Sequence, residues 1–291
     1  KTPMVDSIRA ALTKRILDML SKMATSEPEK YATFWTQFGS VLKEGPSEDN
    51  GNREKIAKLF RFASSTSGSA EQNVSLTDYV ERMKEGQDKI YFVTGDSHSI
   101  IKNSPYLEVF DKHGIEVLLM SDRIDEWMMG YLTEFDGKSF QDVARGELDL
   151  SKITGEEPKS ESNADDEKSE DKENAELLVR IKSLLEDKVE EVRSTSRLTS
   201  SPACLVVGAN DMGEQMRKIM AAAGQAVPEA KPILEINAEH PLVSKLEGES
   251  DDEQAKVLAS VLFDQAALSA GRPLENPAQF VQELNRLMFS N

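Results

Sequence analysis

The sequence predicts a mixed α+β fold. A helical segment is followed by a small strand–helix–strand subdomain and then by an α/β C-terminal domain that ends in a helical hairpin. Three observations support this prediction. Apolar residues recur every three or four positions over residues 4–43, which is the spacing of amphipathic helices. Runs rich in β-branched and aromatic residues occur in both halves of the chain, as expected of strands. A strongly acidic stretch separates the two halves.

Residues 1–87 are predicted to be mainly helical. After a first amphipathic run the pattern restarts at Ser26, which we expect to cap a second helix that ends near Gly45. Further along, Ser75 is followed three residues later by Asp78 at the start of an apolar run. This spacing is close to a capping box and predicts the beginning of another helix.

Residues 88–150 are predicted to form the small αβα subdomain. The runs "KIYFVTG" (89–95) and "IEVLLMS" (115–121) predict two strands, and residues 97–114 predict a helix that ends at Gly114. A strand–helix–strand order favours a parallel pair with a crossover. The loop after the first strand has one Gly and no Lys, so it does not match a phosphate-binding loop.

The acidic stretch, residues 156–176, has ten Asp or Glu residues, three Lys, and no aromatic or β-branched residue. Such a segment buries too little apolar surface to offset its ordering entropy. We therefore predict an acidic flexible segment over 151–175, between a domain at 1–150 and a C-terminal domain at 176–291. The alternative is an acidic segment that binds basic partners.

The C-terminal domain is predicted to alternate helices and strands. In chain order, the predicted elements are a helix over 175–194, a strand over 203–208, a helix over 210–224, a strand over 231–237, and helices over 252–271 and 276–289. Asn210 or Asp211 is expected to cap the second helix and Gly224 to stop it. Asn276 and Pro277 predict the start of the last helix.

Composition excludes several classes of function. The formal net charge of −17 argues against nucleic acid and against anionic membranes, because both require clustered Lys and Arg. No apolar run approaches the ~20 residues of a membrane span. The single cysteine, Cys204, excludes a disulfide framework and fits a reducing cytoplasm.

The sequence shows no catalytic or metal-binding set. The three histidines lie far apart, without metal-ligand spacing. There is no nucleophile elbow and no kinase motif, and the carboxylates are too numerous for any pair to identify an acid and a base. We expect no catalytic residue, no bound cofactor and no metal in these 291 residues.

Methionine is the unusual feature. Eleven occur, several of them on amphipathic helical faces. Flexible, polarisable Met side chains are common on surfaces that bind varied apolar partners, but a Met stripe at helical spacing is also typical of a core. The pattern alone leaves both interpretations open.

Long stretches resemble the heat-shock protein 90 chaperone family. The similar stretches, in family order, are "ALTKRILDMLSKMA", "YATFWTQFGSVLKEG", "IAKLFRFASS", "SLTDYVERMKEGQDKIYFVTGDS", "IEVLLMSDRIDEWMMGYLTEFDGKSF" and "RLTSSPACLVVGANDMGEQMRKIMAAAGQ". The resemblance covers nearly the whole chain except the acidic segment, and is strongest to the bacterial branch. It implies the later part of the family's middle domain followed by its C-terminal dimerisation domain.

The resemblance also implies what this piece lacks. Family members place an ATP-binding domain, with its Mg, ahead of this region, and an Arg that reaches the ATP phosphate from a motif just before it. We therefore expect the parent to be an ATP-driven chaperone and this piece to be inactive as an ATPase. The chain ends "LNRLMFSN", not in the "EEVD" peptide that recruits helical-repeat co-chaperones in eukaryotic members. A bacterial cytoplasmic protein is the corresponding expectation.

Two surfaces are expected from the resemblance. Unfolded or partly folded client proteins should contact an exposed apolar surface that comprises Glu126, Trp127, Tyr131, Met212, Met216, Ile219 and Met220. Trp127 is expected to be partly exposed towards the cleft between protomers, with a core anchor as the equal alternative. The four residues near 212–220 are expected to remain substantially exposed.

The last two helices are expected to form a homodimer. Their apolar stripes are wider than one antiparallel neighbour would cover, so two hairpins related by a two-fold axis would make a four-helix bundle. The interface residues expected are Leu258, Val261, Leu262, Leu268, Phe280, Val281, Leu284, Leu287 and Met288. The alternatives are packing of both helices onto the preceding sheet and, for the whole chain, a dimerisation scaffold without client contacts.

Overall fold

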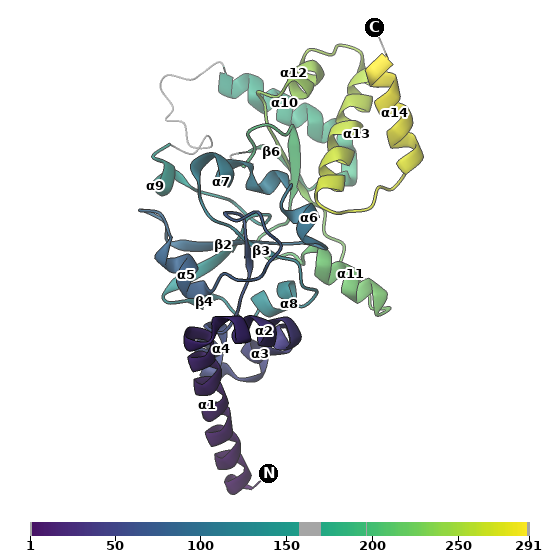
Figure 1. Cartoon of the computed structure of the whole chain (residues 1–291). Coiled ribbons are helices and arrows are strands. Elements are labelled where there is room, and N and C mark those ends of the chain that lie inside the picture. The colour runs from purple at the N-terminus through teal and green to yellow at the C-terminus, as the bar shows by residue number, and fades with distance from the viewer. Residues whose placement is uncertain (1, 157–169, 196, 290–291) are drawn as a thin grey trace. The chain divides into compact units, whose positions relative to one another are not determined.

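The computed structural model describes residues 2–156, 170–195 and 197–289, with helices and strands labelled in Figure 1. By their internal contacts the residues form two units. Unit 1 comprises residues 1–83, 88–98 and 116–141, and unit 2 comprises residues 84–87, 99–115 and 142–291. Residues 84–87, 99–115 and 142–150 therefore group with unit 2 although they precede the predicted boundary at residue 150.

Unit 1 begins with helices. Their bounds are α1 Pro3–Ser26, α2 Pro28–Leu42, α3 Gly45–Glu48, η1 Asn50–Asn52, α4 Arg53–Ala57 and α5 Leu76–Glu81. The prediction that Ser26 caps α2 is wrong: Ser26 ends α1, its hydroxyl donates to the carbonyl of Lys22, and Glu27 occupies the cap position. The capping box of α5 is confirmed, because the Ser75 hydroxyl accepts from the Asp78 amide at 3.0 Å.

A five-stranded sheet forms the centre of unit 1, in the order β1-β3-β2-β5-β4. The strands are β1 Ala63–Ser64, β2 Lys89–Thr94, β3 Leu118–Met120, β4 Glu134–Phe135 and β5 Lys138–Asp142. The parallel pairing of β2 with β3 confirms the predicted crossover. The single helix predicted between them is instead divided into α6 His98–Ile101, η2 Pro105–Leu107 and α7 Glu108–His113. Pro105 lacks an amide hydrogen and cannot continue α6.

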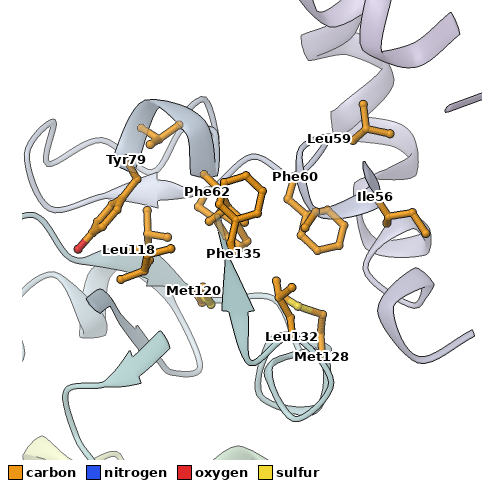
Figure 2. Close-up of a cluster of buried hydrophobic side chains, with 14 of the residues drawn as sticks. Ile56, Leu59, Phe60, Phe62, Tyr79, Leu118, Met120, Met128, Leu132 and Phe135 are labelled. Atoms are coloured by element: carbon orange, nitrogen blue, oxygen red, sulfur yellow. The ribbon is translucent and has the colours of Figure 1, made fainter. Parts of the chain in front are cut away.

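The core of unit 1 is aromatic. Buried side chains from α4, from the sheet and from the segment around α8 (Asp125–Met129) meet in one cluster (Figure 2). The Phe60 ring lies between Trp35 and Phe62, at centroid separations of 6.0 and 6.1 Å. Aromatic pairs at such separations add to the stabilisation from burial. Met128 of α8 packs into this cluster.

Unit 2 is built on a three-stranded sheet in the order β6-β8-β7, with β6 parallel and β7 antiparallel to β8. Its elements after residue 150 are α9 Ser151–Thr154, α10 Glu170–Leu185, η3 Glu186–Lys188, β6 Glu191–Ser194, β7 Ala203–Val206, α11 Glu214–Ala222, β8 Ile233–Ile236, α12 Pro241–Glu247, α13 Asp252–Ser269 and α14 Pro277–Phe289. Helix α10 contacts β6, and α13 contacts β7, α10 and α14.

Two predictions for this unit need comment. The helix predicted over 175–194 is wrong in its last part, because the chain leaves α10 at Leu185 and residues 191–194 form the edge strand β6. Strand β6 pairs with β8 over its full length, and these sheet hydrogen bonds replace those of a continued helix. Of the predicted acidic segment, residues 157–169 lie outside the described residues, whereas residues 170–175 begin α10.

Candidate functional site

Helix α8 presents one buried and one open face in unit 1. Met128 is fully buried in the aromatic core, and Leu132 just beyond the helix is buried as well. Trp127 is partly exposed and Tyr131 is 40% exposed, with their ring centroids 4.9 Å apart. Glu126 is also partly exposed. The predicted partial exposure of Trp127 is confirmed, and its direction towards another protomer stays a prediction.

Behind α8 lies a buried ionic cluster that the sequence did not reveal. The Lys43 ammonium, on a side chain only 1% exposed, contacts Asp122 at 2.8 Å and Asp125 at 2.6 Å. Burial raises the pKa of the Asp125 carboxyl, and the nearby Lys43 charge opposes that rise. Carboxylates are so abundant in this sequence that no local signal could have paired these three residues.

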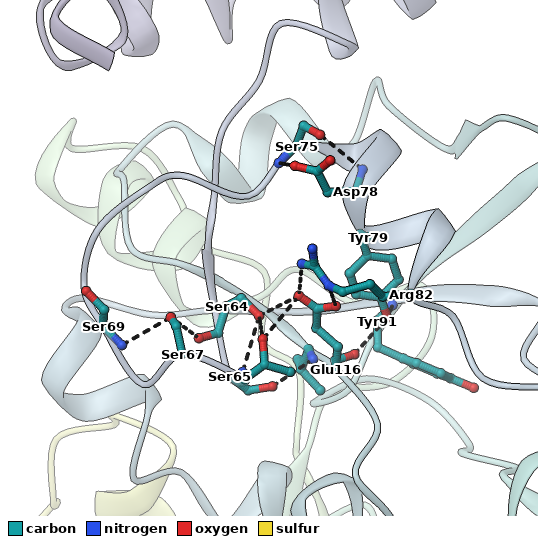
Figure 3. Close-up of polar contacts among 12 residues, drawn as sticks. Ser64, Ser65, Ser67, Ser69, Ser75, Asp78, Tyr79, Arg82, Tyr91 and Glu116 are labelled. Carbon is teal, nitrogen blue, oxygen red and sulfur yellow. Dashed lines mark hydrogen bonds and ion pairs between the residues drawn. The ribbon is translucent and has the colours of Figure 1, made fainter. Parts of the chain in front are cut away.

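A second polar cluster of unit 1 centres on Glu116 (Figure 3). The Glu116 carboxylate binds Arg82 at 2.7 and 3.1 Å and accepts from the Ser64 hydroxyl at 2.6 Å. The Glu116 carbonyl accepts from the Tyr79 hydroxyl, which in turn accepts from the Tyr91 amide. Each of these groups has a partner inside the protein, so the cluster fastens β1 and α5 to β3 and offers no free acid or base.

Helix α11 of unit 2 carries the methionines. It begins at Glu214 with Gly213 in the cap position, so the predicted caps Asn210 and Asp211 are wrong, and Met212 precedes the helix. The Asp211 amide instead donates to the Gly208 carbonyl in a turn. Gly224 has a φ of 70° and stops the helix as predicted.

The predicted exposure of α11 is found only in part. Four apolar side chains are neither buried nor fully exposed, namely Met212, Met216, Ile219 and Met220. Polar contacts hold the helix against the turn after α13: Arg272 lies 3.3 Å from Glu214, and Lys218 donates to the Gly271 carbonyl at 3.0 Å. The apolar row is thus half-covered, because the helix is held close to its neighbours in the same unit.

The predicted dimer residues of α13 differ from one another in burial. Leu258, Val261 and Leu262 are buried inside the chain itself, where α13 packs against β7 and α10. They belong to the core of unit 2, as the alternative of packing onto the sheet implies for this helix. Leu268, near the end of α13, is exposed.

Helix α14 leaves part of its apolar side open, while Leu287 packs against the core of unit 2. It has no buried residue and contacts α13. Val281 is 53% and Met288 67% exposed, and the remaining predicted residues Phe280, Leu284 and Leu287 are partly exposed. The predicted start is confirmed, since α14 begins at Pro277 and the Asn276 side chain accepts from the Gln279 amide at 3.1 Å.

A buried ion network crosses the sheet of unit 2. Arg197 donates to both oxygens of Glu235, at 2.8 and 2.7 Å, and to the carbonyls of Val143 and Gly146. Cys204 lies beside it on β7, paired with Glu235 of β8, and burial raises the pKa of its thiol. Cys204 therefore packs as a small apolar side chain.

Among the described residues, no group of three or more His, Cys, Asp or Glu side chains is placed to hold a metal ion. No helix in the described part of the chain has both the length and the apolar character to cross a membrane. A family model with the description "Hsp90 protein" matches residues 1–291, the whole of the printed sequence. The chain therefore belongs to the Hsp90 family.

Proposed function

We propose that this chain supplies the client-binding surface and the homodimer contact of an ATP-driven chaperone. Members of the Hsp90 family act as chaperones on client proteins, and they dimerise. In the proposal, clients contact α8 through Glu126, Trp127 and Tyr131 and contact α11 through its apolar row, while α14 forms the dimer contact. The ATP and Mg sites belong to another part of the parent protein, and the resemblance of the sequence supports a bacterial cytoplasmic origin.

The observation that carries the client-binding role is the half-exposed apolar row of α11. The helix is anchored by Glu214 and Lys218, yet Met216 and Met220 keep part of their surface open to solvent. Apolar surface that remains open on an otherwise charged protein marks an interaction site. Methionine is suited to clients of varied shape, because its side chain adapts to different apolar partners.

The test is suppression of aggregation of reduced insulin, followed by light scattering. The double variant Met216→Asn/Met220→Asn should lose suppression and keep its melting temperature, because neither side chain belongs to the core. Val179→Asn is the matched control: this residue of α10 is 71% exposed and should tolerate the same change without loss of suppression. Full suppression by the double variant would instead support the scaffold without client contacts.

The open face of α14 supports the homodimer. Covering about four large side chains per protomer stabilises by ~1.5–3 kcal/mol each before association costs are subtracted. Val281→Asp/Met288→Glu should convert a dimer to a monomer by size-exclusion light scattering, with unchanged circular dichroism, because both side chains lie outside the core. Val179→Asp serves as the control for added surface charge. A charged α14 variant that remains dimeric would place the interface elsewhere.

A further inference from the structure

Helix α8 is too short to hold its own orientation. Residues 125–129 make little more than one turn, and isolated helices below ~12–15 residues are marginal in water. Ile124 occupies the N-cap position of α8, and its side chain caps no backbone amide. Met128 and Leu132 anchor one side of the segment in the apolar core, but apolar contacts are non-directional. A directional contact is needed to set the angle at which the open face points.

That directional contact comes from the end of α2. Lys43 follows the last residue of α2, and its ammonium lies between Asp125, the first residue of α8, and Asp122. The second oxygen of Asp125 accepts from the Asp122 amide at 2.8 Å, which closes the turn that leads into α8. The Asp125 side chain is fully buried, so water does not compete for these contacts.

The cluster extends to the aromatic core without leaving a polar atom unpaired. The second oxygen of Asp122 accepts from the Gln72 amide at 3.1 Å, and the other end of Gln72 accepts from the indole of Trp35 at 2.9 Å. The Lys43 ammonium also lies 5.1 Å from the Phe62 ring centroid and 5.7 Å from that of Trp35. The Lys43 and Asp125 side chains at its centre are buried, whereas Asp122 is 32% exposed; a hydrogen-bonded network with a buried centre holds one geometry and penalises others.

We propose that Lys43 is a positioning residue: through Asp122 and Asp125 it sets the orientation of α8 and thereby the direction in which the Trp127–Tyr131 pair faces a client. The proposal rests on the client-binding function proposed above for α8. It assigns Lys43 no contact with the client, since its side chain is buried. Breaking one partner of a buried ion pair destabilises a protein, whereas replacing both by neutral groups of similar volume is often tolerated. A double substitution can therefore test the effect of Lys43 on the orientation of α8 without a large loss of protein stability.

The experiment uses the whole chain and three measurements. The double variant Lys43→Met/Asp125→Asn keeps volume and removes the two buried charges. Asp122 stays charged, but its side chain is 32% exposed and keeps its bond from Gln72, so the melting temperature should stay close to that of the parent. Amide hydrogen exchange of residues 124–132 should quicken about tenfold, because the link from α2 to α8 is lost while the core remains. Suppression of reduced-insulin aggregation should fall to the level of Trp127→Ala. The single variant Lys43→Met should lower the melting temperature, because it leaves Asp125 buried without its counter-charge.

The control removes another ion pair of the same unit, in which the Glu116 side chain is buried and the Arg82 side chain is 47% exposed. Arg82→Met/Glu116→Gln breaks the 2.7 Å contact at β3 and should change neither exchange in residues 124–132 nor suppression. Unchanged exchange in the Lys43→Met/Asp125→Asn variant would overturn the proposal. So would faster exchange with full suppression, provided that Trp127→Ala abolishes suppression. If Trp127→Ala has no effect, the client role of α8 fails, and the exchange measurement alone decides whether Lys43 positions the helix.

Discussion

Replacing Arg197 by methionine should destabilise unit 2 and expose the buried Cys204 more often. The guanidinium is 1% exposed and makes two hydrogen bonds to Glu235, at 2.8 and 2.7 Å, with further bonds to backbone carbonyls. Glu235 is itself only 3% exposed. Methionine fills a similar volume but donates no hydrogen bond, so the substitution leaves the Glu235 carboxylate and the Val143 carbonyl short of donors.

The expected loss of stability in Arg197→Met depends on which partners Glu235 keeps. Removing one member of a buried ion pair costs about 3–5 kcal/mol. Glu235 keeps Arg193 at 2.8 Å and the Thr195 hydroxyl at 2.8 Å, so we expect a loss of about 3 kcal/mol, at the lower end of that range. The matched variant is Arg193→Met. Arg193 donates to Glu235 at 2.9 Å and to the Gly146 carbonyl at 3.2 Å. Its side chain is 21% exposed, so water replaces part of these bonds and its loss should cost about 1 kcal/mol.

The single cysteine provides the assay. Cys204 is 1% exposed and lies opposite Glu235 in the sheet, so a thiol reagent reaches it only when this region opens. A loss of 3 kcal/mol corresponds to roughly a hundredfold faster labelling, and 1 kcal/mol to roughly fivefold. Urea unfolding monitored by circular dichroism gives the free energy independently. Labelling of Arg197→Met at the parent rate, with an unchanged urea midpoint, would show that the buried pair does not hold the sheet.

Three further outcomes are expected. Ser75→Ala removes the capping box of α5 and should cost about 1 kcal/mol in thermal unfolding. Burial tends to raise the pKa of Glu108, but bonds from the Ser201 hydroxyl and from three backbone amides hold that pKa below the ordinary value of a glutamate. Its stabilising effect is therefore present at neutral pH and lost as pH falls through that lowered pKa. Glu108→Gln should accordingly lower the melting temperature at pH 7, with a difference that shrinks below about pH 4. If the ATP site lies in another part of the parent protein, as proposed above, the purified chain should release no phosphate from ATP; turnover that survives a contaminant control would contradict this.

Local sequence patterns were sufficient for most individual elements. The 3.6-residue period located the long helices, and Ser75 with Asp78, Asn276 with Pro277, and Gly224 marked ends that the structure confirms. These signals depend on residues only a few positions apart, so the sequence alone is enough to recognise them. Where a second local group competes, such predictions fail: the hydroxyl of Ser26 binds back into α1 and caps nothing.

The partner of each element depended on contacts between distant residues. Residues 191–194 form a strand because they pair with β8. The sequence of that segment alone does not predict a strand. Leu258 and Leu268 look alike in the helical pattern, yet only Leu258 lies against the sheet of unit 2, while Leu268 faces solvent. Periodicity identifies an apolar face but not what covers it.

The same limit applies to the polar clusters. Lys43 and Asp125 stand 82 positions apart in the chain, and Arg197 and Glu235 stand 38 apart, among many other charged residues. The sequence by itself determined the family, the α+β class and the positions of the long amphipathic helices. Only the tertiary structure decided which charges are buried together, because pairing and desolvation depend on the packing of segments that are remote in the chain.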